Sequence, residues 1–405
     1  TIRTMGPEGV TYEYMRDYTE DINRLADSLM PDADYNNINA INALPSLGGL
    51  AHLSPKEVGR AMQGGSATYK TNVGTLAETF TGSCRPGDAE QLLQLLHLRF
   101  TTLRKDTVAF LRWQQRMQET VAQRIESPMT LFSDTLRETM YEAHPRNRRA
   151  TMGLADSVDY DRTCQLFMER FANAADFTFI FTGAIDEAVA LPLIEKYIGS
   201  LPTTGGKAEK FRDANLDVQK GKHKNIFEKE MATPSASVFI AYSGKAKYNV
   251  KNQLLMSLTK QILDIIYTEE IREKEGGTYG VGTSGSINST PKESARMIVM
   301  FQTAPELREK LTGMAVDLLH KYAEEGPRQK DLDKVREYML KKYTENQKEN
   351  SYWASLLQNN ITADYEGYAD YEKTLNSITT DDLKKFAKSI LKQGNKIEVS
   401  MVGVE

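Results

Sequence analysis

Apolar residues recur along this 405-residue chain with two different spacings. Short stretches alternate apolar and polar positions, as in the run that carries Phe177, Phe179 and Phe181, and this period of two predicts β-strands. Longer stretches repeat apolar residues every three or four positions, and one of them predicts a helix from about Asn249 to Lys274. Strands come early and helices follow, so we expect an α+β fold in which an antiparallel-rich sheet is covered by helices.

The second half of the chain gives the clearest order of elements. It begins with two predicted strands, KNIFEKE and SASVFIAYS, which precede the long helix. Strands around Thr278–Ser289 and Ser294–Thr303 come next, and three or four helices then lead to a closing strand.

Two pairs of stretches indicate an internal repeat. In the first pair, Ser157 falls on Ser377 at an offset of 220 without a gap, and both copies read as a capped helix, a short turn and a strand. In the second pair, stretches that start at Phe80 and Phe301 each run from a strand through a proline into an amphipathic helix, at an offset of 221 to 223. Because the pairs occur in the same order at nearly the same spacing, we predict two tandem homologous domains.

A stretch without apolar periodicity separates the two predicted domains. It is rich in Gly, Thr and charged residues, and we place a linker at 206–224 within it. The first domain then covers 1–205 and the second covers 225–405. Residues 1–60 show no clear match to the two strands that open the second domain, so the N-terminal part of the first domain is expected to be truncated, divergent or discontinuous.

Composition places the chain among ordinary globular proteins. It has 40% hydrophobic and 26% charged residues and a mean hydropathy of −0.50. No apolar run is long enough for a membrane helix, and a net charge of −4 argues against nucleic acid as a partner. Two cysteines are too few for a disulfide framework. The N-terminus does not read as a signal peptide, so we expect that any targeting segment lies outside this chain.

Two stretches resemble a nucleotide-binding and a calcium-binding motif, but their sequence context does not fit either function. GVGTSG fits the dinucleotide-binding pattern, but it follows a predicted helix and leads into a strand, which reverses the order that phosphate binding requires. DADYNN, from Asp32, resembles the start of a calcium loop, but Asn37 stands where a glycine is needed.

The five histidines do not form a metal-binding pattern. His97 and His320 fall at similar places in the repeat, where helix packing explains them, and the others are His52, His144 and His223. Only His320 has a Glu four positions away, Glu324, and none has a second His three or four positions away, so local spacing predicts no metal site in this chain.

The segment IREKEGGTYGV places Arg272 and Tyr279 on either side of Gly276 and Gly277. A structural explanation is that cations complement the helix dipole, a glycine ends the helix, and a tyrosine begins a strand. A functional explanation is that the tight turn brings Tyr279 beside Arg272 at one cleft. A guanidinium offers a planar fork of donors to carbonyl or carboxylate groups, and a phenol, with an ordinary pKa of about 10, is a neutral donor suited to an oxyanion.

At these residues the sequence resembles the zinc metallopeptidases of the pitrilysin and insulysin type, the M16 family, and in particular the C-terminal half of the bacterial PqqL-like members. R-x(6)-Y, GGTYGV, FQTAPE and NSYWASLLQ carry the resemblance in the second domain. FTGSCRPGDAEQLLQLLHLRFT and RIESPMTLF carry it in the first. The resemblance covers roughly residues 30 to 405.

The resemblance implies a two-part enzyme. In the family, an N-terminal half binds Zn²⁺ through H-x-x-E-H, and a C-terminal half closes over the peptide and supplies the Arg and Tyr. H-x-x-E-H is absent here, so zinc is expected on an N-terminal half or partner subunit, and this chain is expected to bind none. Arg272 and Tyr279 are the implied catalytic and substrate-binding pair, with the amides of Gly276 and Gly277 near the peptide backbone.

These implications leave one alternative and one weaker expectation. The alternative is a non-catalytic M16-like scaffold or binding subunit, although a scaffold has no need for both Arg272 and Tyr279. By analogy with exported PqqL-like enzymes, we expect a periplasmic or cell-envelope location.

Overall fold

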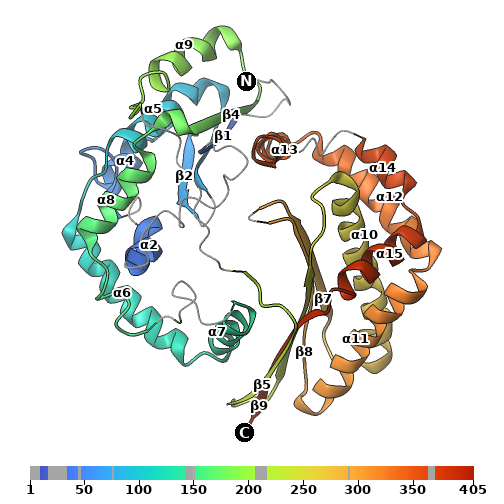
Figure 1. The fold of residues 1–405 in the computed structure, drawn as a ribbon. Helices are drawn as coiled ribbons and strands as arrows, with labels where there is room; N and C mark the ends of the chain where they lie inside the picture. Colours follow the sequence, from blue (N-terminus) through green and yellow to red (C-terminus); the bar gives the residue numbers. More distant parts are fainter. Residues whose placement is uncertain are drawn as a thin grey trace. The chain divides into compact units, whose positions relative to one another are not determined.

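The chain forms two compact α+β units in a computed structural model (Figure 1). The structure describes residues 10–16, 34–43, 47–74, 77–141, 149, 151–205, 217–290, 292–363 and 370–405. The first unit takes its residues from Thr1–Ala122, Ala150–Ala214 and Thr344–Glu366, and the second from Gln123–Arg149, Asn215–Tyr343 and Gly367–Glu405. None of the described helices is long and apolar enough to cross a membrane.

The first unit has a four-stranded sheet in the order β2-β3-β1-β4. All of its strand pairs are antiparallel. Its strands are β1 (Val10–Arg16), β2 (Thr68–Val73), β3 (Glu78–Cys84) and β4 (Phe177–Gly183). Its helices and 3₁₀ turns are α2 (Tyr35–Ala40), η3 (Ile41–Ala43), α4 (Pro55–Ala61), η4 (Pro86–Asp88), α5 (Ala89–Thr101), α6 (Thr107–Ile125), α8 (Tyr160–Phe171), η5 (Ala174–Asp176), α9 (Glu187–Tyr197) and α13 (Asn350–Ala363).

The second unit has a five-stranded sheet in the order β5-β9-β6-β8-β7. Only the outer β5-β9 pair is parallel. Its strands are β5 (Lys222–Glu230), β6 (Ala236–Gly244), β7 (Val281–Asn288), β8 (Ser294–Thr303) and β9 (Asn395–Val404). Its helical elements are α7 (Pro128–Tyr141), α10 (Val250–Tyr267), the π-helix η6 (Thr268–Glu273), η7 (Pro305–Leu307), α11 (Arg308–Glu325), α12 (Gln329–Asn346), α14 (Tyr371–Ser377) and α15 (Thr380–Leu391).

These elements confirm the predicted fold class, an antiparallel-rich sheet covered by helices. The strand orders also show how the repeat works, because β2-β3-β1-β4 corresponds to β7-β8-β6-β9. β1 therefore takes the place of β6, so one of the two strands not recognised in residues 1–60 is present there. β5, in the second sheet, is the one strand that has no counterpart among the described strands of the first sheet.

Helix bounds fix the offsets between the two copies. An offset of 220 superposes α8 on α15 at both ends, as predicted. In the second pair of stretches, the turns before the helix begin at Pro86 and Pro305, 219 residues apart, so the predicted offset of 221 to 223 is wrong by two to four residues. The error arose from matching Phe80 with Phe301, whereas the prolines mark the equivalent turns.

Each unit also contains one helix that comes from the other half of the chain. α7 covers one face of the second sheet, where Phe132 and Met140 pack against Val399 and other buried strand residues. In the same way α13 packs on β4 and β1 of the first sheet, and the Thr182 hydroxyl donates to the Asn350 carbonyl. The predicted linker at 206–224 stays a prediction, although β5, which begins at Lys222, occupies its last three residues.

A helix start in the second unit gives a test by pH. The Thr379 hydroxyl and the Lys251 ammonium bond to the Asp382 carboxylate at 2.7 and 2.9 Å, and together they lower its pKa to about 2. Because the unfolded carboxyl has a pKa of about 3.9, this contribution to stability is complete above pH 4 and is lost as the pH falls toward 2. For Asp382→Asn we expect a loss of less than about 1 kcal/mol at pH 7 that disappears by about pH 2, measured by urea unfolding at each pH.

Candidate functional site

The segment IREKEGGTYGV, residues 271–281, is called the Arg–Tyr segment below, and it begins where the long helix of the second unit ends. Asn249 caps α10, and the helix continues through the π-helix η6, close to the predicted range of Asn249 to Lys274. Tyr267 and Ile271 anchor this end in the core, and the Tyr267 hydroxyl donates to the Ala315 carbonyl at 3.0 Å. Burial raises the pKa of Tyr267, so it stays a neutral donor. A π-helical turn is rare and often marks a functional site.

Arg272 lies on the last turn of this helical segment, with its side chain exposed. The neighbouring charges are paired: Lys274 with Glu270 at 2.7 Å, Glu269 with Arg328 at 2.7 Å, and Glu275 with Lys310. For Arg272, the part of the chain that the structure describes offers no ion-pair partner. The ion pairs brace the segment and leave the guanidinium available to a ligand.

The two glycines shape the turn for different reasons. Gly276 has φ +65°, in the left-handed region that favours glycine, and its amide donates to the Arg272 carbonyl at 3.1 Å. At Gly277 a side chain would clash, because a Cβ would lie 2.7 Å from Leu307 Cδ1. The Thr303 hydroxyl donates to the Gly277 carbonyl at 2.6 Å and holds the turn against β8.

The left-handed backbone at Gly276 gives a second test. No atom lies within 4 Å of a Cβ at this position, so Gly276→Ala introduces backbone strain without a steric clash. We expect it to lower the free energy of unfolding by about 1 kcal/mol, and Gly276→Asn to lower it by less, because asparagine tolerates this conformation better. Urea denaturation of the three proteins measures both effects, and equal losses for Ala and Asn would contradict this origin.

Tyr279 is 99% exposed, so its phenol contributes almost nothing to the core. Thr278 forms a small turn around it, accepting from the Gly280 amide at 3.2 Å and donating to the Gly280 carbonyl at 3.0 Å. β7 then begins at Val281, three residues later than the predicted strand start at Thr278. That Arg272 and Tyr279 face one cleft stays a prediction.

The first unit contains a second copy of this turn that sequence reasoning missed. The segment GRAMQGGSATY matches IREKEGGTYGV at an offset of 212, so that Arg60 corresponds to Arg272 and the glycine pairs coincide. In both copies the turn joins a helix to an edge strand, α4 to β2 here and α10 with η6 to β7 there. The signal was present in the sequence as R-x(3)-G-G-[ST], but the repeat was sought in the helices and strands rather than in this turn.

The two copies share a left-handed first glycine and a crowded second one, and they differ in the phenol. Gly64, like Gly276, has a positive φ, +87°, and a Cβ on Gly65 would clash with Gln91 of α5, much as one on Gly277 would clash before α11. Where the second copy has Tyr279, the first has Ala67, which is only 7% exposed. The turn itself therefore does not require a tyrosine, and an exposed phenol in the second unit needs another explanation.

Three of the five histidines make structural contacts. His97 Nδ1 lies 2.9 Å from the Tyr197 carbonyl oxygen, His223 Nε2 lies 2.8 Å from that of Lys220, and the His320 ring packs edge-on against Tyr242. His52 is exposed, and His144 lies outside the described residues. Within the described ranges, no three His, Cys, Asp or Glu residues come together as a metal site would require.

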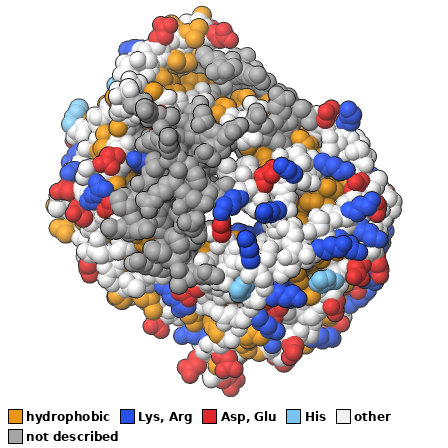
Figure 2. All heavy atoms as spheres, viewed as in Figure 1, with side chains coloured by type: hydrophobic (Ala, Val, Ile, Leu, Met, Phe, Trp, Pro, Cys, Tyr) orange, Lys and Arg blue, Asp and Glu red, His pale blue; other side chains and the backbone are white. Residues whose placement is uncertain are grey.

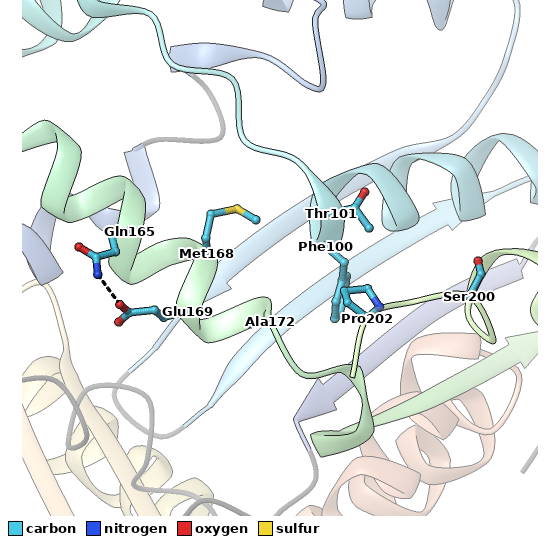
Figure 3. Close-up of a pocket in the computed structure, with 8 residues that line it drawn as sticks. All are labelled: Phe100, Thr101, Gln165, Met168, Glu169, Ala172, Ser200 and Pro202. Carbon is cyan, nitrogen blue, oxygen red and sulfur yellow. Dashed lines mark hydrogen bonds between the residues drawn. The ribbon is translucent and has the colours of Figure 1, made fainter. Parts of the chain in front are cut away.

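A depression of about 640 Å³ lies in the first unit, between α5, α8 and the segment after α9 (Figure 3). Its lining is mostly apolar and includes Phe100, Met168 and Pro202. Its carboxylate, Glu169, accepts from Gln165 at 2.8 Å, as the dashed line in the figure shows. Without convergent polar groups the depression does not resemble a catalytic site.

Basic and acidic side chains are mixed on the surface of the second unit. On the right of Figure 2, where the second unit lies, Lys and Arg side chains have Asp and Glu side chains among them. Several of the unit's lysines are paired, such as Lys247 with Glu293 at 3.3 Å and Lys251 with Asp382 at 2.9 Å. Pairing of this kind weakens the positive potential that a polyanion would need.

Comparison with protein families finds one domain. The family described as the peptidase M16 inactive domain matches residues 164–339. The match begins in α8 and ends in α12, so it includes the whole Arg–Tyr segment.

Curated relatives and a solved structure agree with this family. The chain is 22% identical over 365 residues to a probable zinc protease PqqL of Escherichia coli (86% of this chain, 38% of the relative). It is 24% identical over 284 residues to a zinc protease PQQL-like protein of Arabidopsis thaliana (66% of this chain, 29% of the relative). The crystal structure of the E. coli periplasmic protease PqqL shares the fold, with a TM-score of 0.85 at 18% identity over all of this chain and 44% of that one. The chain thus spans less than half of each of these proteins.

Proposed function

We propose that this chain is the substrate-binding half of a zinc metalloendopeptidase. The proposal starts from its match to the peptidase M16 inactive domain and its homology to PqqL zinc proteases. The zinc site would lie on an N-terminal half or a partner subunit, and the two halves would enclose the peptide in a chamber. The relatives are longer than this chain by more than a factor of two, which leaves room for such a half.

Tyr279 and Arg272 carry this chain's part in the reaction. Tyr279 donates a hydrogen bond from its phenol to the carbonyl oxygen of the scissile bond, and the bond strengthens as negative charge develops on that oxygen. Arg272 holds a neighbouring carbonyl or carboxylate of the peptide with its planar fork of N–H donors. The Gly277 amide lies in the same turn and is available to the peptide backbone, whereas the Gly276 amide already donates to the Arg272 carbonyl. The H-x-x-E-H motif of the other half would hold the zinc ion, which would supply a water activated for attack.

The fully exposed Tyr279 is the observation that carries this proposal. Ion pairs brace the segment that precedes it, and Arg272 is left without an ion-pair partner among the described residues. The equivalent turn of the first unit keeps the arginine and the glycines but has a buried alanine in place of the phenol. An exposed aromatic side chain on a braced turn, which the repeated fold does not require, is typical of a binding site.

The described residues contain no group of three metal ligands. The description of the matching family as an inactive domain is compatible with a second candidate function, a non-catalytic M16-like scaffold or binding subunit. Since one solved relative is described as a periplasmic protease, we extend a periplasmic or cell-envelope location to this chain as part of the proposal.

Complementation tests whether the chain is one half of an enzyme. A library of quenched fluorescent peptides is incubated with Zn²⁺ and this chain, then with the chain and its H-x-x-E-H half together. We expect turnover with the two halves together that exceeds the sum of the separate activities by at least about 10²-fold. Metal-dependent cleavage by this chain alone would contradict the split site, and a mixture no more active than the N-terminal half alone would favour the scaffold.

A further inference from the structure

Both sheets end in strands whose outer backbone groups have no strand beside them among the described residues. Such edges invite pairing with other chains, and natural proteins commonly protect them with charged side chains, by shortening them or by covering them. β5, at one edge of the second sheet, is protected by charge. Five of its nine residues are charged: Lys222, Lys224, Glu228, Lys229 and Glu230.

The first sheet protects its edges as well. β2 is short and carries Lys70, whose side chain is exposed. β4 has no charge, but five of its seven residues are buried, and α13 packs on it.

β7, the remaining edge, carries no charge of its own and is not short, although α10 packs on its buried face as α13 does on β4. Its sequence, VGTSGSIN, contains no charge and no proline over eight residues. Gly282, Ser284 and Ser286 are exposed. By the offset of 212 that relates the two Arg–Gly-Gly turns, Gly282 corresponds to Lys70, so β7 has no lysine at the position where β2 carries one.

One hydrogen bond shows which backbone groups of β7 point outward. The Thr283 amide donates to the Asp264 carboxylate of α10 at 2.9 Å, so it points away from β8. Because outward and inward groups alternate along an antiparallel edge, the amides of Val281, Gly285 and Ile287 point outward too. None of these three amides has a hydrogen-bond acceptor among the described residues.

The sheet face away from α10 is also open beside β7. α7 covers this face over β5, β9 and β6, but Met300 on β8 is 47% exposed, and it lies opposite Gly282 in the register. An extended chain at the edge would find an apolar contact there.

We propose that an extended peptide pairs with the edge of β7 and adds a strand to the second sheet. β7 begins two residues after Tyr279, so a peptide paired there continues to the phenol proposed to act on its scissile carbonyl. Main-chain bonds to Val281, Gly285 and Ile287 select unfolded, extended segments rather than a particular sequence. This inference rests on the proposed function, which identifies the bound peptide as a substrate. Peptide binding by this chain can be measured without catalysis.

Residue-resolved hydrogen exchange tests the pairing on the unmodified chain. The probe is a fluorescein-labelled ten-residue peptide of Thr, Ser and Val, chosen because it is uncharged and favours extended backbone. In the free chain, we expect the outward amides of Gly285 and Ile287 to exchange faster than the inward amides of Ser284 and Ser286. Saturating peptide should slow the outward amides at least about tenfold and leave the inward ones unchanged. Peptide binding without this protection, or no binding at about 1 mM peptide, would overturn the proposal.

N-methylated peptides provide a matched control. Each methyl group removes one backbone donor, so a scan along the peptide should weaken binding about fivefold at alternate positions only. Equal effects at all positions, or none, would mean that the peptide does not bind as a strand.

Gly282→Lys restores the charge that β2 carries. Its Cβ meets no atom closer than 3.9 Å, so the fold should tolerate it, and we expect about fivefold weaker peptide binding. Unchanged affinity would count against the edge as the binding site.

Tyr279→Phe separates this inference from the proposed function. If the pairing is correct and the catalytic role is not, the variant retains both the β7 protection and full turnover in the mixture of the two halves. If the catalytic role is correct and the pairing is not, the variant loses turnover, and β7 is unprotected in both proteins.

Discussion

Tyr279→Phe is expected to lower kcat of the assembled two-part enzyme by about 10²-fold. The change removes one oxygen and its proton, and loss of a single donor to a developing oxyanion costs about 10²–10³ in rate. Because the bond is stronger in the transition state than in the ground state, KM should change much less than kcat. Stability should be unchanged, because a side chain that is 99% exposed packs against almost nothing.

Steady-state kinetics on one quenched peptide measures this effect, and thermal unfolding of the variant checks the fold. Tyr338→Phe is the matched control, since Tyr338 is also an exposed tyrosine of the second unit but lies on α12, outside the Arg–Tyr turn. If Tyr279→Phe turns over peptide as fast as the Tyr338 variant, the phenol is not catalytic, and the scaffold function becomes the better one.

The fold was largely predictable from the sequence because its elements carry strong local patterns. The offset of 220 predicted equivalent helices, and α8 and α15 do match at both ends under it. β1 was missed for a physical reason. Its sequence, VTYEYMR, alternates tyrosine with glutamate and methionine instead of presenting aliphatic residues at every second position, so its place in the sheet depends on pairing with β3 and β4.

The sequence did not predict that α7 belongs to the second unit and α13 to the first, for a related reason. α7 and α13 each look like an ordinary amphipathic helix, and periodicity reports that a face is buried but not which sheet buries it. The contacts of Phe132 with the second sheet and of Asn350 with the first decide that, and they join residues far apart in the sequence.

The candidate site was predictable only as a set of residue types. Spacing predicted a helix end, a glycine turn and a strand, and all three are present. The exposure of Tyr279 and the ion pairs that occupy the charges near Arg272 depend on side-chain packing, which a short motif does not encode. The turn around Arg60 was predictable from the shared R-x(3)-G-G-[ST] pattern. It shows what the fold requires of such a turn when no phenol is present.

Arg272→Ala is expected to lower kcat/KM of the assembled enzyme by about tenfold to 10²-fold, mostly through KM. The variant loses the planar donor fork, and charge-assisted hydrogen bonds of this kind contribute about 1.5–3 kcal/mol. Arg272→Lys should recover only part of the loss, because an ammonium keeps the charge but not the paired geometry. The fold should be unaffected, since the ion pairs of Glu269, Glu270 and Glu275 are made with other cations.

Arg60→Ala is the matched control for that variant. Arg60 is an exposed arginine that precedes a glycine pair in the same kind of turn, but Ala67 replaces the phenol there. Kinetics of both variants over a range of peptide concentrations separates two explanations. If only the Arg272 variant is impaired, the effect belongs to the Arg–Tyr site. If both variants are impaired equally, loss of a surface arginine is sufficient to explain the effect, and the specific role of Arg272 must be abandoned.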